Sequence, residues 1–247
     1  MRGIMTVKIK ELRCVHRHSI ETHPACFAQG KVNYKFKDDR EYERVLGVPW
    51  YQYPGYKIGY LDIEVSGGFY ADWGTMLTWC LKEKGGKTAH DIITRKEMLN
   101  GTVDRRITQS LVDEMKKYKI IVSYYGTGFD LPYVRTKALG WGIDFPGFSY
   151  KEEANGTFMN SPEIYHWDMY YTVRNKLKLS RSSLDNACDY LGIAGKTPIS
   201  KSVWRKAMYG DKKSLDTVLV HNIADVEILE ELHDKLTPFR RWTRKGI

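Results

Sequence analysis

The stretch YLDIEVSGGF, residues 60–69, carries the pattern that decides the fold. The apolar side chains at positions 61, 63 and 65 are typical of a buried strand, and Asp62 and Glu64 alternate with them. Because side chains two positions apart share one face of a strand, both carboxylates lie on the same face. In a sheet that is covered on both sides, unpaired carboxylates on one face are costly. We therefore expect a positively charged partner for this pair of acids.

Segments with regular hydrophobic patterns follow this stretch and predict an α/β fold. The first two expected strands can pair as a hairpin, and the later strands alternate with helices, which is typical of a mixed sheet flanked by helices. The expected strands are 57–65, 76–83, 120–125 and 163–170, and the expected helices are 107–118, 131–137 and 214–236. Residues 147–162 have the composition of an exposed loop.

The first 56 residues differ in composition from the rest of the chain. They contain a Cys/His-rich run, a charged stretch and an aromatic segment with proline and glycine. We expect residues 1–56 to form an N-terminal appendage and linker, residues 57–238 to form the α/β domain, and residues 239–247 to form a basic tail.

The charge of the chain favours nucleic acid as a partner. The formal net charge is +9, and the terminal segment PFRRWTRKGI, residues 238–247, combines cations with an aromatic ring. Such surfaces often bind nucleic acid, although a charge excess can also serve only solubility. Because no apolar run reaches the roughly 18 residues of a membrane span and no signal peptide is evident, we expect a cytoplasmic or nucleoid-associated protein without membrane contact. Composition leaves the oligomeric state open.

Two further acids occupy positions that are unusual for solvent-facing carboxylates. Asp130 follows an apolar segment and a glycine-bearing turn, at the start of an expected helix. Asp225 lies beside the apolar stripe of the last helix, with His221 one turn earlier on the same side. Each acid alone could be a helix cap or a salt-bridge partner, but capping does not explain the two strand acids.

Four carboxylates that converge in a fold would repel one another unless cations lie between them. Hard oxygen ligands select Mg²⁺ or Mn²⁺, and two such ions roughly 4 Å apart can activate water and stabilise the leaving oxygen of a phosphodiester. A basic protein with such a centre would cleave nucleic acid.

Three segments resemble, in order and spacing, the three motifs of the DEDD superfamily of exonucleases. They are LDIEV at 61–65, FDLPYV at 129–134 and HNIADVEILEEL at 221–232. The chain is most similar to the proofreading exonuclease domain of family B DNA polymerases and to stand-alone ribonuclease H-like relatives. This resemblance implies a ribonuclease H-like fold and 3′-to-5′ removal of nucleotides with two Mg²⁺ or Mn²⁺ ions.

The resemblance also implies a role for each acid. Asp62 would bridge both ions, Glu64 and Asp225 would hold the ion that activates water, and Asp130 would support the second ion. The relatives usually carry tyrosine where this chain has His221, with the same three residues before the final aspartate. An imidazole can orient the attacking water or accept its proton, although a histidine on a packed helix can also be a hydrogen-bonded core residue.

A second departure from the relatives is Tyr125, in the tripeptide YYG where the polymerases commonly have YNG. This difference concerns contacts with the substrate strand more than metal binding. Asp168 could line the same cleft or cap the helix near Thr172. The ring of Phe129 could stack on a base or belong to the core. Four nearby cations could grip phosphates or form a solvated helix face: Arg174, Lys176, Lys178 and Arg181.

The run CVHRHSIETHPAC, residues 14–26, gathers five cysteine and histidine residues: Cys14, His16, His18, His23 and Cys26. Their types and the spacings C-x-H and H-x2-C suit a tetrahedral Zn²⁺ held by Cys14, His16, His23 and Cys26. The loop between the two pairs is shorter than in ordinary zinc fingers, and a metal-free, histidine-rich loop is the alternative.

These expectations combine into a metal-dependent 3′–5′ exonuclease that hydrolyses DNA from a single-stranded 3′ end, with an appendage that holds a structural Zn²⁺. Two alternatives remain at this stage. One is a nuclease directed at RNA, and the other is a nucleic-acid-binding module of the same fold with little catalytic activity. The complete set of four acids favours an enzyme over a binding module.

Overall fold

The computed structural model describes residues 8–152, 158–194, 198–239 and 246–247. The chain divides into two compact units, Met1–Tyr56 and Lys57–Ile247. None of the helices in the described parts is both long and apolar enough to cross a membrane.

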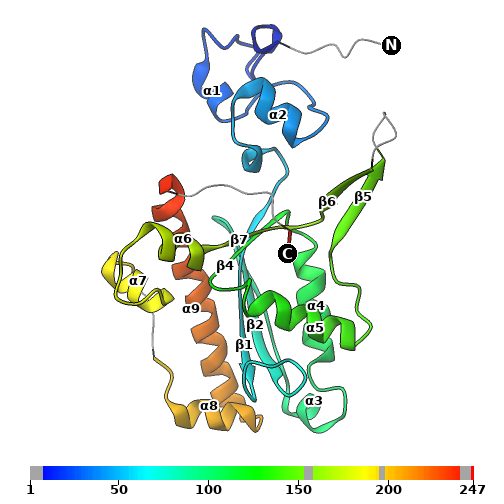
Figure 1. Ribbon diagram of the computed structural model, residues 1–247, viewed down its shortest axis with the longest axis vertical. Helices are drawn as coiled ribbons and strands as arrows, with labels where there is room; N and C mark the ends of the chain where they lie inside the picture. Colours follow the sequence, from blue (N-terminus) through cyan, green and yellow to red (C-terminus); the bar gives the residue numbers. More distant parts are fainter. Residues whose placement is uncertain (1–7, 153–157, 195–197, 240–245) are drawn as a thin grey trace. The chain divides into compact units, whose positions relative to one another are not determined.

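The larger unit contains a mixed sheet, which among the described residues has five strands in the order β3-β2-β1-β4-β7 (Figure 1). Strand β1 pairs antiparallel with β2, and β2 pairs antiparallel with β3, whereas β1, β4 and β7 run parallel to one another. The predicted α/β class with a mixed sheet is therefore confirmed. The strands are β1 (Ile58–Ser66), β2 (Thr75–Glu83), β3 (Thr88–Ile92), β4 (Ile120–Ser123) and β7 (Tyr165–Asp168).

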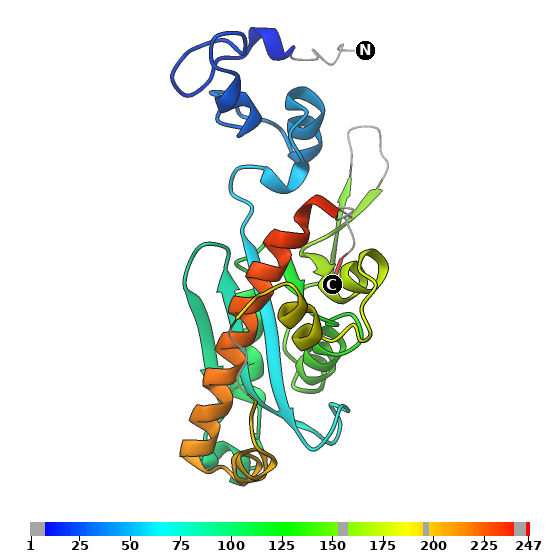
Figure 2. The same cartoon turned by 90° about the vertical axis from the view of Figure 1, so that its left-hand side faces the viewer.

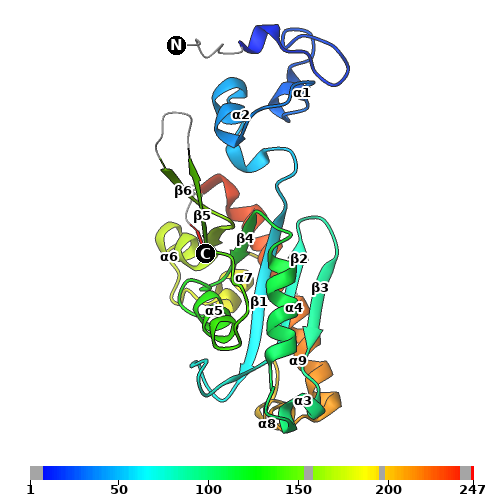
Figure 3. The same cartoon turned by 90° about the vertical axis from the view of Figure 1, so that its right-hand side faces the viewer.

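Helices cover both faces of this sheet. Helix α9 (Lys212–Leu236) runs across one face along β1 and β2 (Figure 2), and α4 (Arg105–Met115) and α5 (Asp130–Gly140) lie on the other face (Figure 3). Leu61 and Ile63 pack in the core that includes residues of α4 and α5. Tyr60 lies on the opposite face of β1, and its hydroxyl forms a hydrogen bond of 2.8 Å with Nδ1 of His233 on α9. Since side chains alternate along a strand, Asp62 and Glu64 lie beneath α9 with Tyr60.

Shorter helices complete the larger unit: α3 (Arg95–Leu99), α6 (Met169–Lys176), α7 (Leu184–Tyr190) and α8 (Lys201–Met208). Helix α7 begins after Ser183 and α8 begins after Ser200, and each serine side chain accepts a hydrogen bond from the backbone N–H of the third residue of its helix. Such serine caps satisfy amide groups that the first helical turn leaves without partners. Helix α8 packs against α9 (Figure 1).

The expectation of an exposed loop over residues 147–162 is wrong. Strands β5 (Phe148–Glu152) and β6 (Phe158–Pro162) pair antiparallel there, with Phe148 opposite Pro162. Residues 153–157 lie outside the described parts. The Asn-Gly pair at 155–156 is the sequence signal that favours a hairpin over a loop.

The smaller unit, Met1–Tyr56, contains two α-helices among its described residues, α1 (Pro24–Ala28) and α2 (Asp39–Leu46), and two short 3₁₀ turns, Ile9–Glu11 and Trp50–Gln52. Asp38 caps α2 by accepting a hydrogen bond from the backbone N–H of Glu41. A small core joins the segments through Leu12, Cys14, Cys26, Phe27, Phe36, Tyr42 and Val48.

Candidate active site

The two strand acids lie at the interface between β1 and α9. Asn222 of α9 donates a hydrogen bond from its amide to Oδ2 of Asp62, and the hydroxyl of Thr78 on β2 donates to the amide oxygen of Asn222 over 3.3 Å. Asn222 is fully buried, so this pair of bonds fixes the orientation of Asp62. Sequence reasoning missed Asn222, although it adjoins His221 within the segment HNIAD.

Glu64, His221 and Asp225 form a compact group, here called the acid–histidine cluster. Nε2 of His221 lies 3.8 Å from Oε1 of Glu64 and 3.7 Å from Oδ2 of Asp225. One ligand atom from each side chain lies within 4.8 Å of the others. Asp225 is buried at 6% exposure rather than turned to solvent. The cluster therefore brings a strand residue and two helix residues, about 160 positions apart, within the reach of one cation.

The other ring nitrogen of His221 is also informative. Nδ1 is buried and has no hydrogen-bond partner among the described residues. Buried polar atoms are normally paired with protein or with water, so an atom of this kind calls for a ligand or a water at the site. The imidazole thus has one nitrogen facing the carboxylates and one buried nitrogen without a hydrogen-bond partner among the described residues.

Asp130 reaches β1 from the first residue of α5. Its Oδ1 accepts a hydrogen bond of 3.2 Å from the backbone N–H of Ile63, and the side chain is 3% exposed. The cap position of α5 is occupied by Phe129, so the carboxyl of Asp130 serves the strand instead. Burial, together with the charge of Asp168, raises the pKa of Asp130 to about 7. A cation bound beside this carboxyl would favour its charged form and so lower its pKa.

Cys80 lies opposite Asp62 in the pairing of β1 with β2. Burial raises the pKa of this thiol far above its ordinary value, and the charges of Asp62, Glu64 and Asp225 raise it further. Cys80 therefore stays a neutral thiol beside the acids and supplies no nucleophile at neutral pH.

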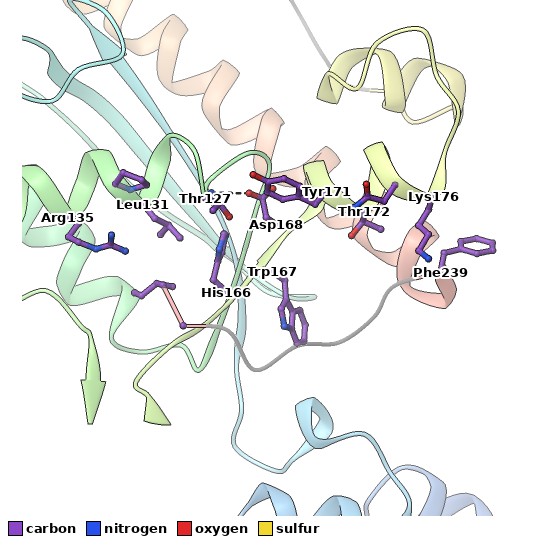
Figure 4. Close-up of a pocket in the computed structure, with 14 residues that line it drawn as sticks. Thr127, Leu131, Arg135, His166, Trp167, Asp168, Tyr171, Thr172, Lys176 and Phe239 are labelled. Carbon is purple, nitrogen blue, oxygen red and sulfur yellow. Dashed lines mark hydrogen bonds between the residues drawn. The ribbon is translucent and has the colours of Figure 1, made fainter. Parts of the chain in front are cut away.

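Asp168 links the end of β7 to the loop before α5. Its Oδ1 accepts hydrogen bonds from the backbone N–H groups of Tyr125 and Tyr170, over 2.8 and 3.1 Å. Its Oδ2 accepts a third, of 2.9 Å, from the N–H of Thr127, as the dashed line in Figure 4 marks. The carboxylate therefore caps α6 and also holds the loop that leads to Asp130.

A cavity of about 600 Å³ adjoins Asp168 on the α5 side of the sheet (Figure 4). Its lining includes Thr127, Arg135, His166 and Lys176, and none of the acid–histidine cluster lines it. His166 is buried, and its Nε2 lies 2.7 Å from the hydroxyl of Ser123. The acid–histidine cluster, by contrast, lies on the α9 side.

The residues expected to contact nucleic acid lie near this cavity or at the protein surface. The four cations of the 173–181 segment are exposed, with Arg174 and Lys176 on α6 and Lys178 and Arg181 in the segment that follows it. Lys176 also lines the cavity. The ring of Phe129 is half-buried, and its centroid lies 5.5 Å from that of the exposed Phe69.

The donor set at the interface of β1, α5 and α9 fits divalent cations. It combines carboxylate oxygens, which suit Mg²⁺ and Mn²⁺, with one imidazole nitrogen that Mn²⁺ accepts more readily than Mg²⁺. The Nδ1 of His221 is buried without a hydrogen-bond partner among the described residues, and burial raises the pKa of Asp130, whose charged form a nearby cation would favour. The described part of the chain thus provides a possible acidic metal site in the larger unit and a Cys/His cluster in the smaller one.

Comparison with known proteins agrees with this geometry. A family model described as the RNase_H superfamily matches residues 59–237. A DNA polymerase of Methanocaldococcus jannaschii is 30% identical over 115 residues, which are 42% of this chain and 7% of the polymerase. The family B DNA polymerase of Pyrobaculum calidifontis superposes with a TM-score of 0.58 at 21% identity, over 78% of this chain and 25% of the polymerase chain. This chain therefore spans only a small part of the length of either polymerase.

The mixed sheet between two helical layers, with acids along its central strand, defines the class as ribonuclease H-like. The chain belongs to the RNase H superfamily, and the resemblance to proofreading exonuclease domains is confirmed. Family and likeness together support a nuclease that binds nucleic acid.

Proposed function

We propose that the protein is a 3′–5′ exonuclease that depends on two Mg²⁺ or Mn²⁺ ions and degrades DNA from a single-stranded 3′ end. The observation that carries this proposal is the convergence of Glu64 and Asp225 at His221. Asp62 lies on the same face of β1 as Glu64, and Asp130 accepts a hydrogen bond from the backbone of the same strand. Carboxylates that gather in one place repel one another, so this convergence favours a cation between them.

Each residue has a distinct part in this proposal. Asp62, Glu64, Asp130 and Asp225 would hold the ions, which when bound neutralise charge on the phosphodiester and activate water. Asn222 orients Asp62 through its amide. His221 positions the attacking water and accepts its proton.

The reaction is a hydrolysis. The water oxygen forms a bond to phosphorus, the bond from phosphorus to the 3′ oxygen of the preceding nucleotide breaks, and that oxygen leaves with a proton. The product is a 5′-mononucleotide and a strand shortened by one residue. Phe129 and Phe69 would offer rings for stacking of the terminal bases, and Lys176 would lie close enough to the cavity to meet a phosphate.

The test of the proposal is digestion of end-labelled single-stranded DNA in the presence of Mg²⁺, with RNA and circular single-stranded DNA assayed side by side. We expect stepwise loss of nucleotides from the 3′ end of linear DNA and no cleavage of the circle. Asp62→Ala should reduce turnover by at least about 10³-fold, because the ligand shared by both ions is lost, while nucleic-acid binding is retained.

Asp144→Asn is the matched control, since Asp144 is exposed and paired with Lys116, and neither residue belongs to the candidate site. Full activity in folded Asp62→Ala protein would contradict the two-ion assignment. Binding of DNA by wild type without any turnover in Mg²⁺ or Mn²⁺ would favour the binding module, and faster digestion of RNA than of DNA would favour the RNA-directed nuclease.

A further inference from the structure

The smaller unit holds a second group of metal-ligating side chains, formed by Cys14, His16, His23 and Cys26 and here called the Cys/His quartet. Nδ1 of His23 lies 3.3 Å from Sγ of Cys14, and Nδ1 of His16 lies 3.4 Å from Sγ of Cys26. The remaining measured pair, Sγ of Cys14 and Nδ1 of His16, is 4.0 Å apart. One atom from each of the four side chains lies within 4.8 Å of the others.

These separations match the edges of a zinc tetrahedron. Bonds of about 2.3 Å to sulfur and about 2.0–2.1 Å to nitrogen, at tetrahedral angles, place sulfur and nitrogen ligands about 3.6 Å apart. The three sulfur–nitrogen distances in the quartet fall on either side of that value. We infer that Cys14, His16, His23 and Cys26 bind one structural Zn²⁺ in a closed, four-coordinate site.

Backbone structure on both sides of the quartet presents the ligands to one point. Cys14 pairs with Val32 in an isolated bridge, and its N–H donates to the carbonyl of His18 over 2.9 Å. Arg17 takes a left-handed conformation, with φ 67°, and its N–H returns to the carbonyl of Cys14. This tight turn brings His16 close to Cys14. The left-handed conformation of Arg17 is strained for a residue with a side chain, so other contacts must hold it.

The second half of the quartet lies at the start of α1. The N–H of Cys26 donates to the carbonyl of His23 over 3.2 Å, so the two ligands face the same side of one turn. Both cysteines are buried, at 0% and 7% exposure, whereas His16 is exposed and His23 is half-buried. The thiols thus anchor the site in the small core and the imidazoles close it from outside.

The ligand set decides both the metal and its role. Two thiolates and two imidazoles favour Zn²⁺ over Mg²⁺ or Mn²⁺, which prefer oxygen ligands. Because four protein ligands fill a tetrahedron, no position is left for water or substrate, and the site is structural rather than hydrolytic. Its contribution is to the unit Met1–Tyr56, whose core is small enough to need such a crosslink.

His18 provides a matched control within the same run. Its ring lies 5.0 Å from that of His23 and 6.5 Å from that of His16, but it is not part of the quartet. Asp225→Asn provides a second control, because it removes a ligand of the acid–histidine cluster, which is the second group of possible metal ligands among the described residues.

The experiment measures zinc per chain in the full-length protein by elemental analysis and by intact mass under native conditions. We expect about one zinc per chain in wild type, in His18→Ala and in Asp225→Asn. We expect at least a tenfold loss of zinc affinity in His23→Ala and in Cys26→Ser, measured by competition with a chromophoric chelator. A large excess of Mg²⁺ should leave the bound zinc in place.

A second measurement keeps the inference testable if a ligand variant fails to fold. In wild type, Cys14 and Cys26 should resist alkylation when zinc is bound and react after chelation, while Co²⁺ in place of zinc should give the visible absorption of a tetrahedral thiolate site. The absence of bound zinc after reconstitution would overturn the inference. So would a disulfide between Cys14 and Cys26 in the purified protein, or a loss of zinc from His18→Ala equal to that from His23→Ala.

Discussion

His221 is the residue at which this chain departs from the motif of its relatives, and its surroundings allow two roles. Nε2 lies near both Glu64 and Asp225, so the ring could ligate an ion directly. It could instead position an attacking water beside these carboxylates. Imidazole is a poor ligand for Mg²⁺, so the second role agrees better with an Mg²⁺-dependent reaction.

We therefore predict that His221→Ala lowers kcat by about 100-fold, the usual scale for a positioned general base. His221→Tyr should remain within about tenfold of wild type, because a phenol can hydrogen-bond water at the same place. The measurement is turnover on single-stranded DNA over a range of Mg²⁺ concentrations. The half-saturating Mg²⁺ concentration should be nearly the same in all three proteins.

A rise of that Mg²⁺ concentration in both variants, with kcat recovered at high Mg²⁺, would make His221 an ion ligand. Full activity in His221→Ala at all Mg²⁺ concentrations would show that the histidine has only a structural role.

Asp130 allows a prediction about stability and pH. Burial raises its pKa in the folded protein to about 7, whereas an unfolded chain has a value of 3.8. The folded state therefore binds more protons than the unfolded state between these two values, and the free energy of unfolding falls as the pH rises through this window. The loss is of the order of 4 kcal/mol, at about 1.4 kcal/mol for each pKa unit.

We predict that Asp130→Asn removes this fall in the free energy of unfolding with pH. The amide oxygen can still accept the hydrogen bond from the N–H of Ile63, and the side chain carries no charge. Denaturant unfolding at about pH 4 and about pH 8, without added Mg²⁺ or Mn²⁺, measures the effect as a difference between variant and wild type. Asp144→Asn is the control and should change neither value. Equal pH dependence in wild type and Asp130→Asn would show that Asp130 does not carry the slope.

At the scale of elements, Asp168 joins β7, α6 and the loop that precedes α5. Its carboxylate accepts a hydrogen bond from the N–H of Tyr125, a residue whose backbone is left-handed with φ 64°. A tyrosine adopts this conformation at a cost of about 1 kcal/mol or more, so the loop depends on the bonds that hold it. Because the loop ends at Asp130, its position affects the candidate site.

We predict that Asp168→Ala lowers the free energy of unfolding by about 1–2 kcal/mol through the lost cap, and reduces turnover through displacement of the loop. Asp168→Asn keeps one acceptor oxygen and should lie between Ala and wild type in both measurements. A different outcome is that Asp168→Ala and Asp168→Asn both lose turnover while keeping the stability of wild type. That result would indicate that the carboxylate itself acts on ions or substrate.

At the scale of the whole molecule, a buried ionic contact ties the sheet to its α4–α5 layer. Asp104 is fully buried, and its carboxylate lies 3.0 Å from Nζ of Lys137 on α5. It also accepts hydrogen bonds from the N–H of Met76 on β2, over 2.9 Å, and from the indole of Trp141, over 3.0 Å. Sequence reasoning gave no sign of this acid, because its partners come from two other segments, β2 and the end of α5.

We predict that Asp104→Ala lowers the free energy of unfolding by about 3–5 kcal/mol, since it removes the buried carboxylate that pairs with Lys137 and accepts hydrogen bonds from Met76 and Trp141. The double variant Asp104→Ala, Lys137→Met should lose less than the sum of the two single changes. Denaturant unfolding measures the cycle. The exposed pair Lys212 and Asp216 is the control, and breaking it should cost no more than about 0.5 kcal/mol. Additive losses in the buried pair would contradict the coupling.

The sequence by itself determined the elements whose signals are local. Strand β1, strand β2 and helix α9 lie within two residues of the expected ranges, because alternation and three- to four-residue spacing are written into short stretches. The order and spacing of the motifs around Asp62, Asp130 and Asp225 were enough to indicate the superfamily. Local pattern failed at 147–162, where β5 and β6 depend on pairing with each other.

Only the tertiary structure decided how distant residues meet. The bond between Asn222 and Asp62 joins positions 160 residues apart, and the contacts of Asp168 and Asp104 likewise cross between elements. No local pattern specifies such contacts, because they depend on how layers pack and on which buried polar atoms then find partners. The same packing turns Glu64, His221 and Asp225 from three separate signals into one cluster that could hold an ion.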